Sequence, residues 1–154
     1  MKNITIECKK LSEKAIIPTK AHDDDACFDL YAAGASSLKQ LDTGEFILTV
    51  HTDIAVAIPK GYAGEIHLRS SSAFKPYTLA NGVGIVDSGY RGELLILLRF
   101  PGNIKNLGEY FSSPPVKIAQ LKIIELPEVE FLEVDEFSQK ETARGQGGFG
   151  STGT

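Results

Sequence analysis

Residues 46–69 read FILTVHTDIAVAIPKGYAGEIHLR, and this stretch decides the fold class. It contains three short runs that are candidates for strands. These runs are residues 46–50, 54–58 and 65–69. Between them lie His51-Thr52-Asp53 and Pro59-Lys60-Gly61, which are typical turn residues. The stretch therefore predicts three successive short strands and an all-β protein.

The flanking sequence extends the same pattern. Residues 93–100, ELLILLRF, are nearly all apolar and lie between Gly92 and Pro101-Gly102, which predicts a buried strand. The N-terminal Ile4, Ile6 and Cys8 alternate with polar residues, and residues 116–126 predict a long strand. Short strands at this spacing indicate a sandwich, jelly roll or barrel. At most one short helix is expected, near residues 70–75 before Pro76.

Length and composition predict a single soluble domain. The chain has 154 residues, of which 42% are hydrophobic, and this suits one compact core. A formal net charge of -4 disfavours nucleic acid as a partner, because that binding relies on clustered Lys and Arg. Cys8 and Cys27 form no disulfide framework, and we expect reduced thiols. No signal peptide or membrane span is visible, so we expect a cytoplasmic protein with no membrane partner.

The C-terminal residues 142–154, TARGQGGFGSTGT, predict a mobile arm that clamps a nucleotide. Glycines let backbone amides approach an anion, and Arg144 offers a planar fork of donors to phosphate. Phe149 offers a ring for stacking on a base. A disordered Gly/Ser tail is the alternative. The dinucleotide fingerprint fails because no helix can follow, and a P-loop fails because Ser151 occupies the lysine position.

Residues 81–93, NGVGIVDSGYRGE, predict a β-hairpin that carries reactive side chains. Gly82 and Gly84 allow the backbone to approach a flat ligand and to imitate the pairing edge of a base. Asp87 is the candidate general base, and Tyr90 is placed to lie against a sugar. The alternative is a Gly-rich turn in which Asp87 serves only as a cap.

Three shorter segments add candidates. Arg69-Ser70-Ser71-Ser72 either opens an anion-binding helix or provides a plain N-cap. Asp29 lies in an apolar stretch and needs a partner. Gln120 lies in a strand, where its amide either binds a phosphate oxygen or satisfies a backbone group. Residues 23–25 are three aspartates without regular metal-ligand spacing, which favours a solvated loop. His22, His51 and His67 form no metal or triad pattern and are assigned no role.

Taken in order, these five segments resemble the five motifs of the trimeric dUTPase family. The resemblance runs from about Ile17 to Gly153, and the C-terminal arm and residues 81–92 are its most specific parts. Two motifs depart from the family pattern. Ser71 and Ser72 replace the usual Gly and Leu after Arg69-Ser70, and Pro114-Pro115-Val116 precede Lys117.

The resemblance implies a jelly-roll or β-clip-type barrel that assembles as a homotrimer with shared active sites. Residues 1–137 would form the barrel domain, and residues 138–154 a flexible arm closing a neighbouring active site. The implied reaction is hydrolysis of dUTP to dUMP and pyrophosphate, which keeps uracil out of DNA and supplies dUMP for thymidylate synthesis. The implied cofactor is Mg²⁺, held by the triphosphate and by no direct protein ligand.

The resemblance also implies residue roles. Asp87 would activate the water that attacks the α-phosphate, and Asp29 would act through water near Mg²⁺. Asn81, together with the backbone at Gly84 and Val86, would recognise uracil, and Tyr90 would pack against deoxyribose. Phe149 would cover uracil, and Arg144 would bind the γ-phosphate. Arg69, Ser70 and Gln120 would contact or order the phosphate region, and Ser151 and Thr152 would complete the phosphate cradle. Ser71 and Gly150 would also bind the substrate.

Two other functions compete with this one. A dCTP deaminase-like enzyme shares the fold and an Arg-Ser-Ser segment. However, deaminases carry a catalytic glutamate directly after the hairpin aromatic, where this chain has Arg91, and they lack the arm. A nucleotide-sensing binding module would keep the pocket without turnover, and Asp87 argues against such an inactive site.

Overall fold

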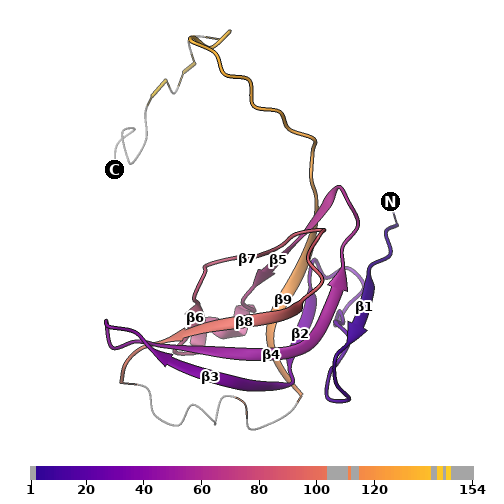
Figure 1. The fold of residues 1–154 in the computed structure, drawn as a ribbon, viewed down its shortest axis with the longest axis vertical. Coiled ribbons are helices and arrows are strands. Elements are labelled where there is room, and N and C mark those ends of the chain that lie inside the picture. The colour runs from indigo at the N-terminus through magenta and orange to yellow at the C-terminus, as the bar shows by residue number, and fades with distance from the viewer. Residues whose placement is uncertain (1–2, 104–110, 112–114, 140–141, 144, 147–154) are drawn as a thin grey trace.

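Two antiparallel sheets form the body of the protein in the computed structural model, which describes residues 3–103, 111, 115–139, 142–143 and 145–146 (Figure 1). One sheet has five strands, in the order β1-β4-β8-β6, and β3 also pairs with β4. Its strands are β1 (Glu7–Lys10), β3 (Gly34–Gln40), β4 (Phe46–Ala57), β6 (Thr78–Leu79) and β8 (Glu93–Phe100).

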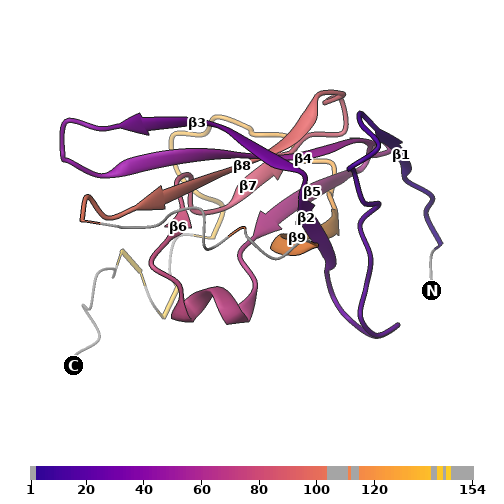
Figure 2. The ribbon, with the colours of Figure 1, turned by 90° about the horizontal axis from the view of Figure 1, so that it is seen from below.

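The second sheet has four strands, in the order β2-β9-β5-β7. They are β2 (Phe28–Ala32), β5 (Tyr62–His67), β7 (Gly84–Val86) and β9 (Val116–Glu125). A short 3-10 helix, η1 (Ser70–Phe74), links β5 to β6 (Figure 2). The expected all-β jelly roll with at most one short helix is therefore confirmed, and none of the described helical structure is long or apolar enough to cross a bilayer.

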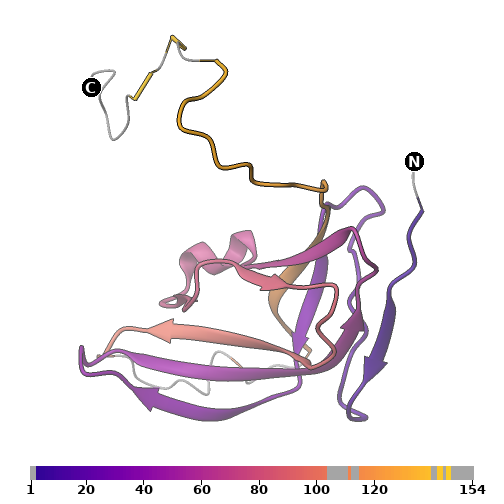
Figure 3. The ribbon, with the colours of Figure 1, turned by 45° about the horizontal axis from the view of Figure 1, so that its top comes forward.

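The core lies between the two sheets, which face each other in Figure 3. Along β8 every second side chain, starting at Leu94, is buried, while Leu95 and Leu97 on the other face are exposed. This alternation places apolar side chains of both sheets in one cluster. Its fully buried members include Leu30, Val50, Ile54, Ile96, Leu98, Phe100 and Ile118.

The predicted turn at His51-Thr52-Asp53 was wrong, because β4 continues through it as one strand of 12 residues. The register with β8 shifts between His51 and Ala55, so these residues form a bulge. Asp53 has a positive φ of 52°, which few non-glycine residues adopt. The Thr52 hydroxyl donates a hydrogen bond to the Leu94 carbonyl at 2.7 Å. Because β1, β3 and β8 all pair with β4, residues that are typical of turns are accommodated inside this strand.

The predicted hairpin over residues 81–93 was also wrong. Its first half, β7, pairs with β5 in the four-stranded sheet, whereas its second half, β8, pairs with β4 and β6 in the other sheet. Residues 87–92 therefore form a crossover between the two sheets. These residues leave the four-stranded sheet at its edge strand β7 and enter the five-stranded sheet at β8.

After β9 the chain leaves the sheets and runs away from the body, as Figures 1 and 3 both show. Residues 126–134 have no regular secondary structure. Large apolar side chains in this segment are exposed, including Phe131 at 95% and Leu132 at 81%. The proposed boundary between barrel and arm at residues 137 and 138 stays a prediction.

Candidate active site

A cavity of about 180 Å³ lies where the chain passes from one sheet to the other. Its lining includes all the candidates of the predicted hairpin except Gly82, together with apolar and acidic neighbours from β5 and β8. The five candidates are Asn81, Gly84, Val86, Asp87 and Tyr90. The structure therefore brings these residues together, although the hairpin that suggested them does not exist.

Glycines shape the approach to this cavity. Gly82 has a φ of 73°, and its amide donates to the Leu79 carbonyl at 3.2 Å, which turns the chain before β7. A Cβ on Gly84 would lie 3.2 Å from Cβ of Ile66 and 3.5 Å from Nδ2 of Asn81. Any larger residue at position 84 would therefore push against the cavity wall.

Tyr90 is held by the crossover itself. Its hydroxyl donates to the Glu93 carbonyl at 2.9 Å, and its amide donates to the Asp87 carbonyl at 3.0 Å. The ring lies over Gly92, where a Cβ would come within 2.5 Å of the hydroxyl oxygen. These contacts fix Tyr90 relative to Asp87, and the ring remains 44% exposed.

The carboxylate of Asp87 is exposed and receives no hydrogen bond from the described part of the chain. The alternative in which Asp87 serves as a turn cap therefore finds no support, because the turn uses its backbone carbonyl instead. An unpaired carboxylate at the edge of a cavity is free to accept a proton from a bound water.

A second group of candidates surrounds the buried side chain of Asp29 on β2. Nε of Arg69 donates to one carboxylate oxygen of Asp29 at 2.7 Å, and Nζ of Lys117 lies 2.7 Å from the other oxygen. The hydrogen bond to Asp29 raises the pKa of the Lys117 amine above its usual value. The predicted need of Asp29 for a partner is confirmed, and it has two.

Lys117 was missed as a site residue. The only signal in the sequence was its place at the start of the segment Lys117-Ile118-Ala119-Gln120-Leu121. Its ion pair with Asp29 depends on the pairing of β2 with β9, where Asp29 lies opposite Gln120. Without that register, no spacing rule connects a lysine at position 117 with an aspartate at position 29.

Gln120 and the serines resolve two open alternatives. Nε2 of Gln120 donates to the Leu68 carbonyl at 2.8 Å, so its amide satisfies a backbone group next to Arg69. Ser70 and Ser71 are exposed in η1, whose N-cap residue is Arg69 and which has no side-chain cap. The plain N-cap role for the serines was therefore wrong, and their hydroxyls remain available to a ligand.

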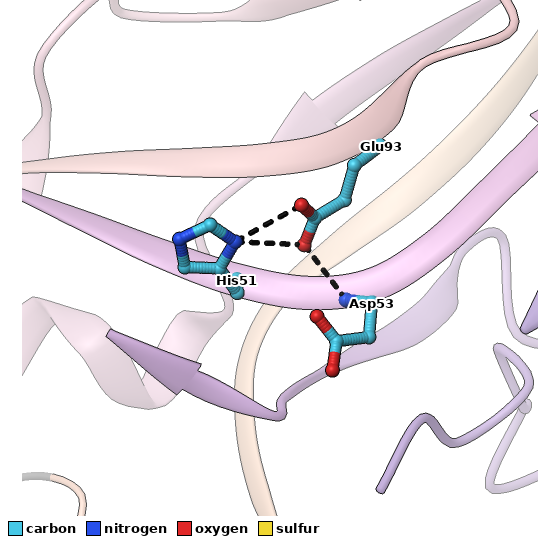
Figure 4. A group of neighbouring side chains, drawn as sticks. All are labelled: His51, Asp53 and Glu93. Carbon is cyan, nitrogen blue, oxygen red and sulfur yellow. Dashed lines mark hydrogen bonds and ion pairs between the residues drawn. The ribbon is translucent and has the colours of Figure 1, made fainter. Parts of the chain in front are cut away.

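A third cluster joins His51, Asp53 and Glu93, whose possible ligand atoms lie within 4.8 Å of one another (Figure 4). Nδ1 of His51 lies 2.9 Å from Oε2 of Glu93, and Oε1 of Glu93 accepts the Asp53 amide at 2.9 Å. Ser12 donates to the Asp53 carboxylate, and Ser36 bonds to Nε2 of His51. These partners hold the β4 bulge to the start of β8, so His51, which the sequence left without a role, has a structural one.

The three residues of the Asp29 group, which are Asp29, Arg69 and Lys117, are not among those that line the Asp87 cavity. The remaining candidates, Arg144, Phe149, Gly150, Ser151 and Thr152, lie outside the described residues.

Comparison with known proteins points to one family throughout. The dUTPase family model matches residues 13–153. The deoxyuridine 5'-triphosphate nucleotidohydrolase of Clostridium novyi is 39% identical over 148 residues, covering 94% of this chain and 96% of that protein. The protein of the same name from Mycolicibacterium gilvum is 42% identical over 141 residues, covering 89% of this chain and 87% of that protein.

Solved structures give the same result. The dUTPase of Staphylococcus bacteriophage 80alpha with dUPNHPP superposes with a TM-score of 0.79 at 27% identity, covering 99% of this chain and 100% of that one. A dUTPase from phage phi11 of S. aureus, described with a structural Mg(II) ion, superposes with a TM-score of 0.70 at 26% identity. That match covers 88% of this chain and 100% of the phage protein.

Proposed function

The chain belongs to the dUTPase family and is a dUTP diphosphatase, and on that premise we propose that Asp87 is the general base of its reaction. In this proposal Asp87 takes a proton from a water molecule that attacks the α-phosphate. The bond from the α-phosphorus to the bridging oxygen breaks, and dUMP and pyrophosphate leave. The observation that carries the proposal is the exposed, unpaired carboxylate at the edge of the 180 Å³ cavity.

The cavity would bind the deoxyuridine part of the substrate. Asn81 and the backbone at Gly84 and Val86 would pair with the uracil edge, since all three residues line the same cavity. We propose that this cavity also excludes a base with a 5-methyl group by its size, since a Cβ added at Gly84 would already lie 3.2 Å from Cβ of Ile66. The ring of Tyr90, held over Gly92, would pack against deoxyribose and leave no room for a 2′-hydroxyl.

The Asp29 group would bind the phosphates. Arg69, Ser70 and Ser71 would contact the phosphates, and Gln120 would order this region through its hydrogen bond to the Leu68 carbonyl. The arm residues Arg144, Gly150, Ser151 and Thr152 would complete the phosphate contacts, while Phe149 would cover uracil. Mg²⁺ carried by the triphosphate would neutralise charge on the phosphate oxygens. Asp29 suits an indirect role beside such an ion, because each oxygen already accepts one hydrogen bond and keeps a lone pair for water.

We place the complete site between subunits of a homotrimer. The residues of the Asp29 group do not line the Asp87 cavity, and this cavity of about 180 Å³ is smaller than the roughly 300–1,000 Å³ of typical ligand pockets. Two surfaces support association. Leu95 and Leu97 form an exposed apolar stripe on β8, and residues 126–137 expose large apolar side chains away from the body.

The test is Asp87→Asn combined with isotope labelling. The substitution removes the base but preserves size and polarity, so dUTP should still bind while turnover falls by about 10²–10⁴-fold. Hydrolysis by the unsubstituted protein in ¹⁸O water should place the label in dUMP. Normal turnover by the variant would disprove the base assignment, and label in pyrophosphate would disprove attack on the α-phosphate.

The deaminase alternative is tested by ammonia release from dCTP, and the sensor alternative by tight dUTP binding without pyrophosphate release. Arg91 argues against deamination, because it supplies no carboxylate at the position of the deaminase glutamate. Its guanidinium instead donates to the Ser88 and Tyr90 carbonyls at 2.6 and 2.7 Å. A cytoplasmic location and the role in keeping uracil out of DNA stay predictions from the sequence.

A further inference from the structure

The charges around Asp29 are unbalanced. Asp29 is 8% exposed, and each oxygen of its carboxylate is engaged by a different cation, Arg69 on one side and Lys117 on the other. A buried carboxylate with a single cation would form a neutral pair. Here two cations face one anion, so the group as a whole keeps one positive charge.

The free donors of this group belong mainly to Arg69. A guanidinium carries five N–H donors, and Asp29 takes only the one on Nε. Within the described part of the chain, the terminal nitrogens of Arg69 have no acceptor, and the side chain is 31% exposed. Ser70 and Ser71 follow directly with exposed hydroxyls. An excess positive charge beside unused N–H and O–H donors suits a phosphate.

Lys117 supplies the second positive charge of this group, and the net charge of the group depends on it. Its amine bonds to Asp29 and lies 6.0 Å from the centre of the Tyr31 ring, which places the ammonium group between an anion and an aromatic face. Without Lys117, Asp29 would cancel the charge of Arg69. With Lys117, Asp29 can fix the Nε side of Arg69 while the group stays cationic.

We infer that Lys117 is a positioning residue for the triphosphate. Its positive charge offsets the negative charge of Asp29, so that Asp29 holds Arg69 in place while the group of three residues keeps a net positive charge. This inference rests on the proposed function, because it assumes that the phosphates lie at the Asp29 group. It assigns Lys117 a role through Arg69 and requires no direct contact between Lys117 and substrate.

The first test compares Lys117→Met with Lys117→Arg and with Lys122→Met, the last being a control at an exposed lysine on the same strand. Lys117→Met should raise KM for dUTP about tenfold and weaken inhibition by inorganic tripolyphosphate by a similar factor. Binding of deoxyuridine, which has no phosphate, should stay within twofold. Lys117→Arg should restore both values, and Lys122→Met should match the unsubstituted protein.

The second test is a charge-balance cycle. Adding Asp29→Asn to Lys117→Met removes the anion as well as its second cation and leaves the charge of Arg69 uncancelled. The double variant should therefore recover part of the tripolyphosphate affinity lost by Lys117→Met alone. A lysine needed only for folding gives no such recovery, and the thermal unfolding midpoint of each variant, measured alongside, reports on that role.

The outcomes distinguish failure of the inference about Lys117 from failure of the proposed function. If the unsubstituted protein hydrolyses dUTP but Lys117→Met keeps its KM and tripolyphosphate affinity, the inference about Lys117 is wrong. Equal loss of deoxyuridine and tripolyphosphate binding, without recovery in the double variant, also overturns it. If dUTP is not hydrolysed by the unsubstituted protein, the proposed function itself fails.

Discussion

Gly92 lies beneath the ring of Tyr90, and its missing side chain is what allows that ring to fold back onto the crossover. A Cβ at this position would lie 2.5 Å from the Tyr90 hydroxyl oxygen and 2.6 Å from Cζ. Such distances are far inside van der Waals contact. The hydrogen bond from Tyr90 to the Glu93 carbonyl depends on the same placement. At the scale of single residues, the proposed selectivity of Tyr90 for deoxyribose would therefore depend on Gly92 as much as on the tyrosine.

Gly92→Ala should displace Tyr90 and reduce discrimination against a 2′-hydroxyl. We expect the ratio of kcat/KM for dUTP over UTP to fall about tenfold, equivalent to roughly 1.4 kcal/mol of lost discrimination. The measurement is the steady-state rate of pyrophosphate release with each nucleotide. Gly89→Ala is the matched control, because nothing lies within 4 Å of a Cβ at that position. An unchanged ratio in Gly92→Ala would show that Tyr90 does not read the sugar.

At the scale of elements, Glu93 connects the bulge of β4 to the start of β8. Its carboxylate accepts the amide of Asp53 and pairs with Nδ1 of His51, and the side chain of Glu93 is only 19% exposed. The bulge places the amide of residue 53 where no strand partner can reach it. Glu93 takes the place of that missing backbone acceptor.

Glu93→Ala should therefore destabilise the fold by about 2 kcal/mol, because a partly buried amide and the His51 ring lose their acceptor. Denaturant unfolding at one fixed protein concentration measures this, since assembly makes apparent stability depend on concentration. The control is Glu65→Ala, which breaks the more exposed pair with His67 and should cost no more than about 1 kcal/mol. Equal losses in both variants would contradict a special role for Glu93 in the bulge.

The success of the sequence predictions also varied by element. Residues 93–100 and 116–126 were placed within one residue of β8 and β9, because their apolar runs end at clear turn signals or polar residues. The strand β3, GASSLKQ, was missed, because it is exposed along its whole length and shows no alternation. The hairpin over residues 81–93 failed because pairing partners far away in the chain, on β5 and β4, override a local turn pattern.

For the candidate site, local chemistry was predictable and long-range contacts were not. The Gly-rich segment identified the residues that line the Asp87 cavity. The need of Asp29 for a partner followed from its apolar surroundings, but Arg69 and Lys117 as the partners did not. Ion pairs between residues 40 and more positions apart depend on strand register, which a single sequence specifies only through the finished fold.

At the scale of the whole molecule, the proposal requires more than one chain. The Asp29 group does not line the Asp87 cavity. The segment after β9 runs away from the body (Figure 3), and its large apolar side chains are exposed. A protein that leaves such a segment uncovered gains stability when another copy covers it. In the proposed trimer, Asp87 of one subunit and the arm of another therefore act on the same nucleotide.

Subunit complementation tests this claim most directly. Asp87→Asn and a variant truncated after Ala143 are each expected to form trimers with little dUTP hydrolysis, and they are unfolded and refolded together so that hybrid trimers form. Native mass measurement confirms the hybrids. We predict that hydrolysis reappears in the mixture, because sites then form with Asp87 from a truncated chain and the arm from an Asp87→Asn chain. Hybrid trimers without recovered hydrolysis would contradict the shared site, because that is the result expected if Asp87 and the arm serve the same site from one chain.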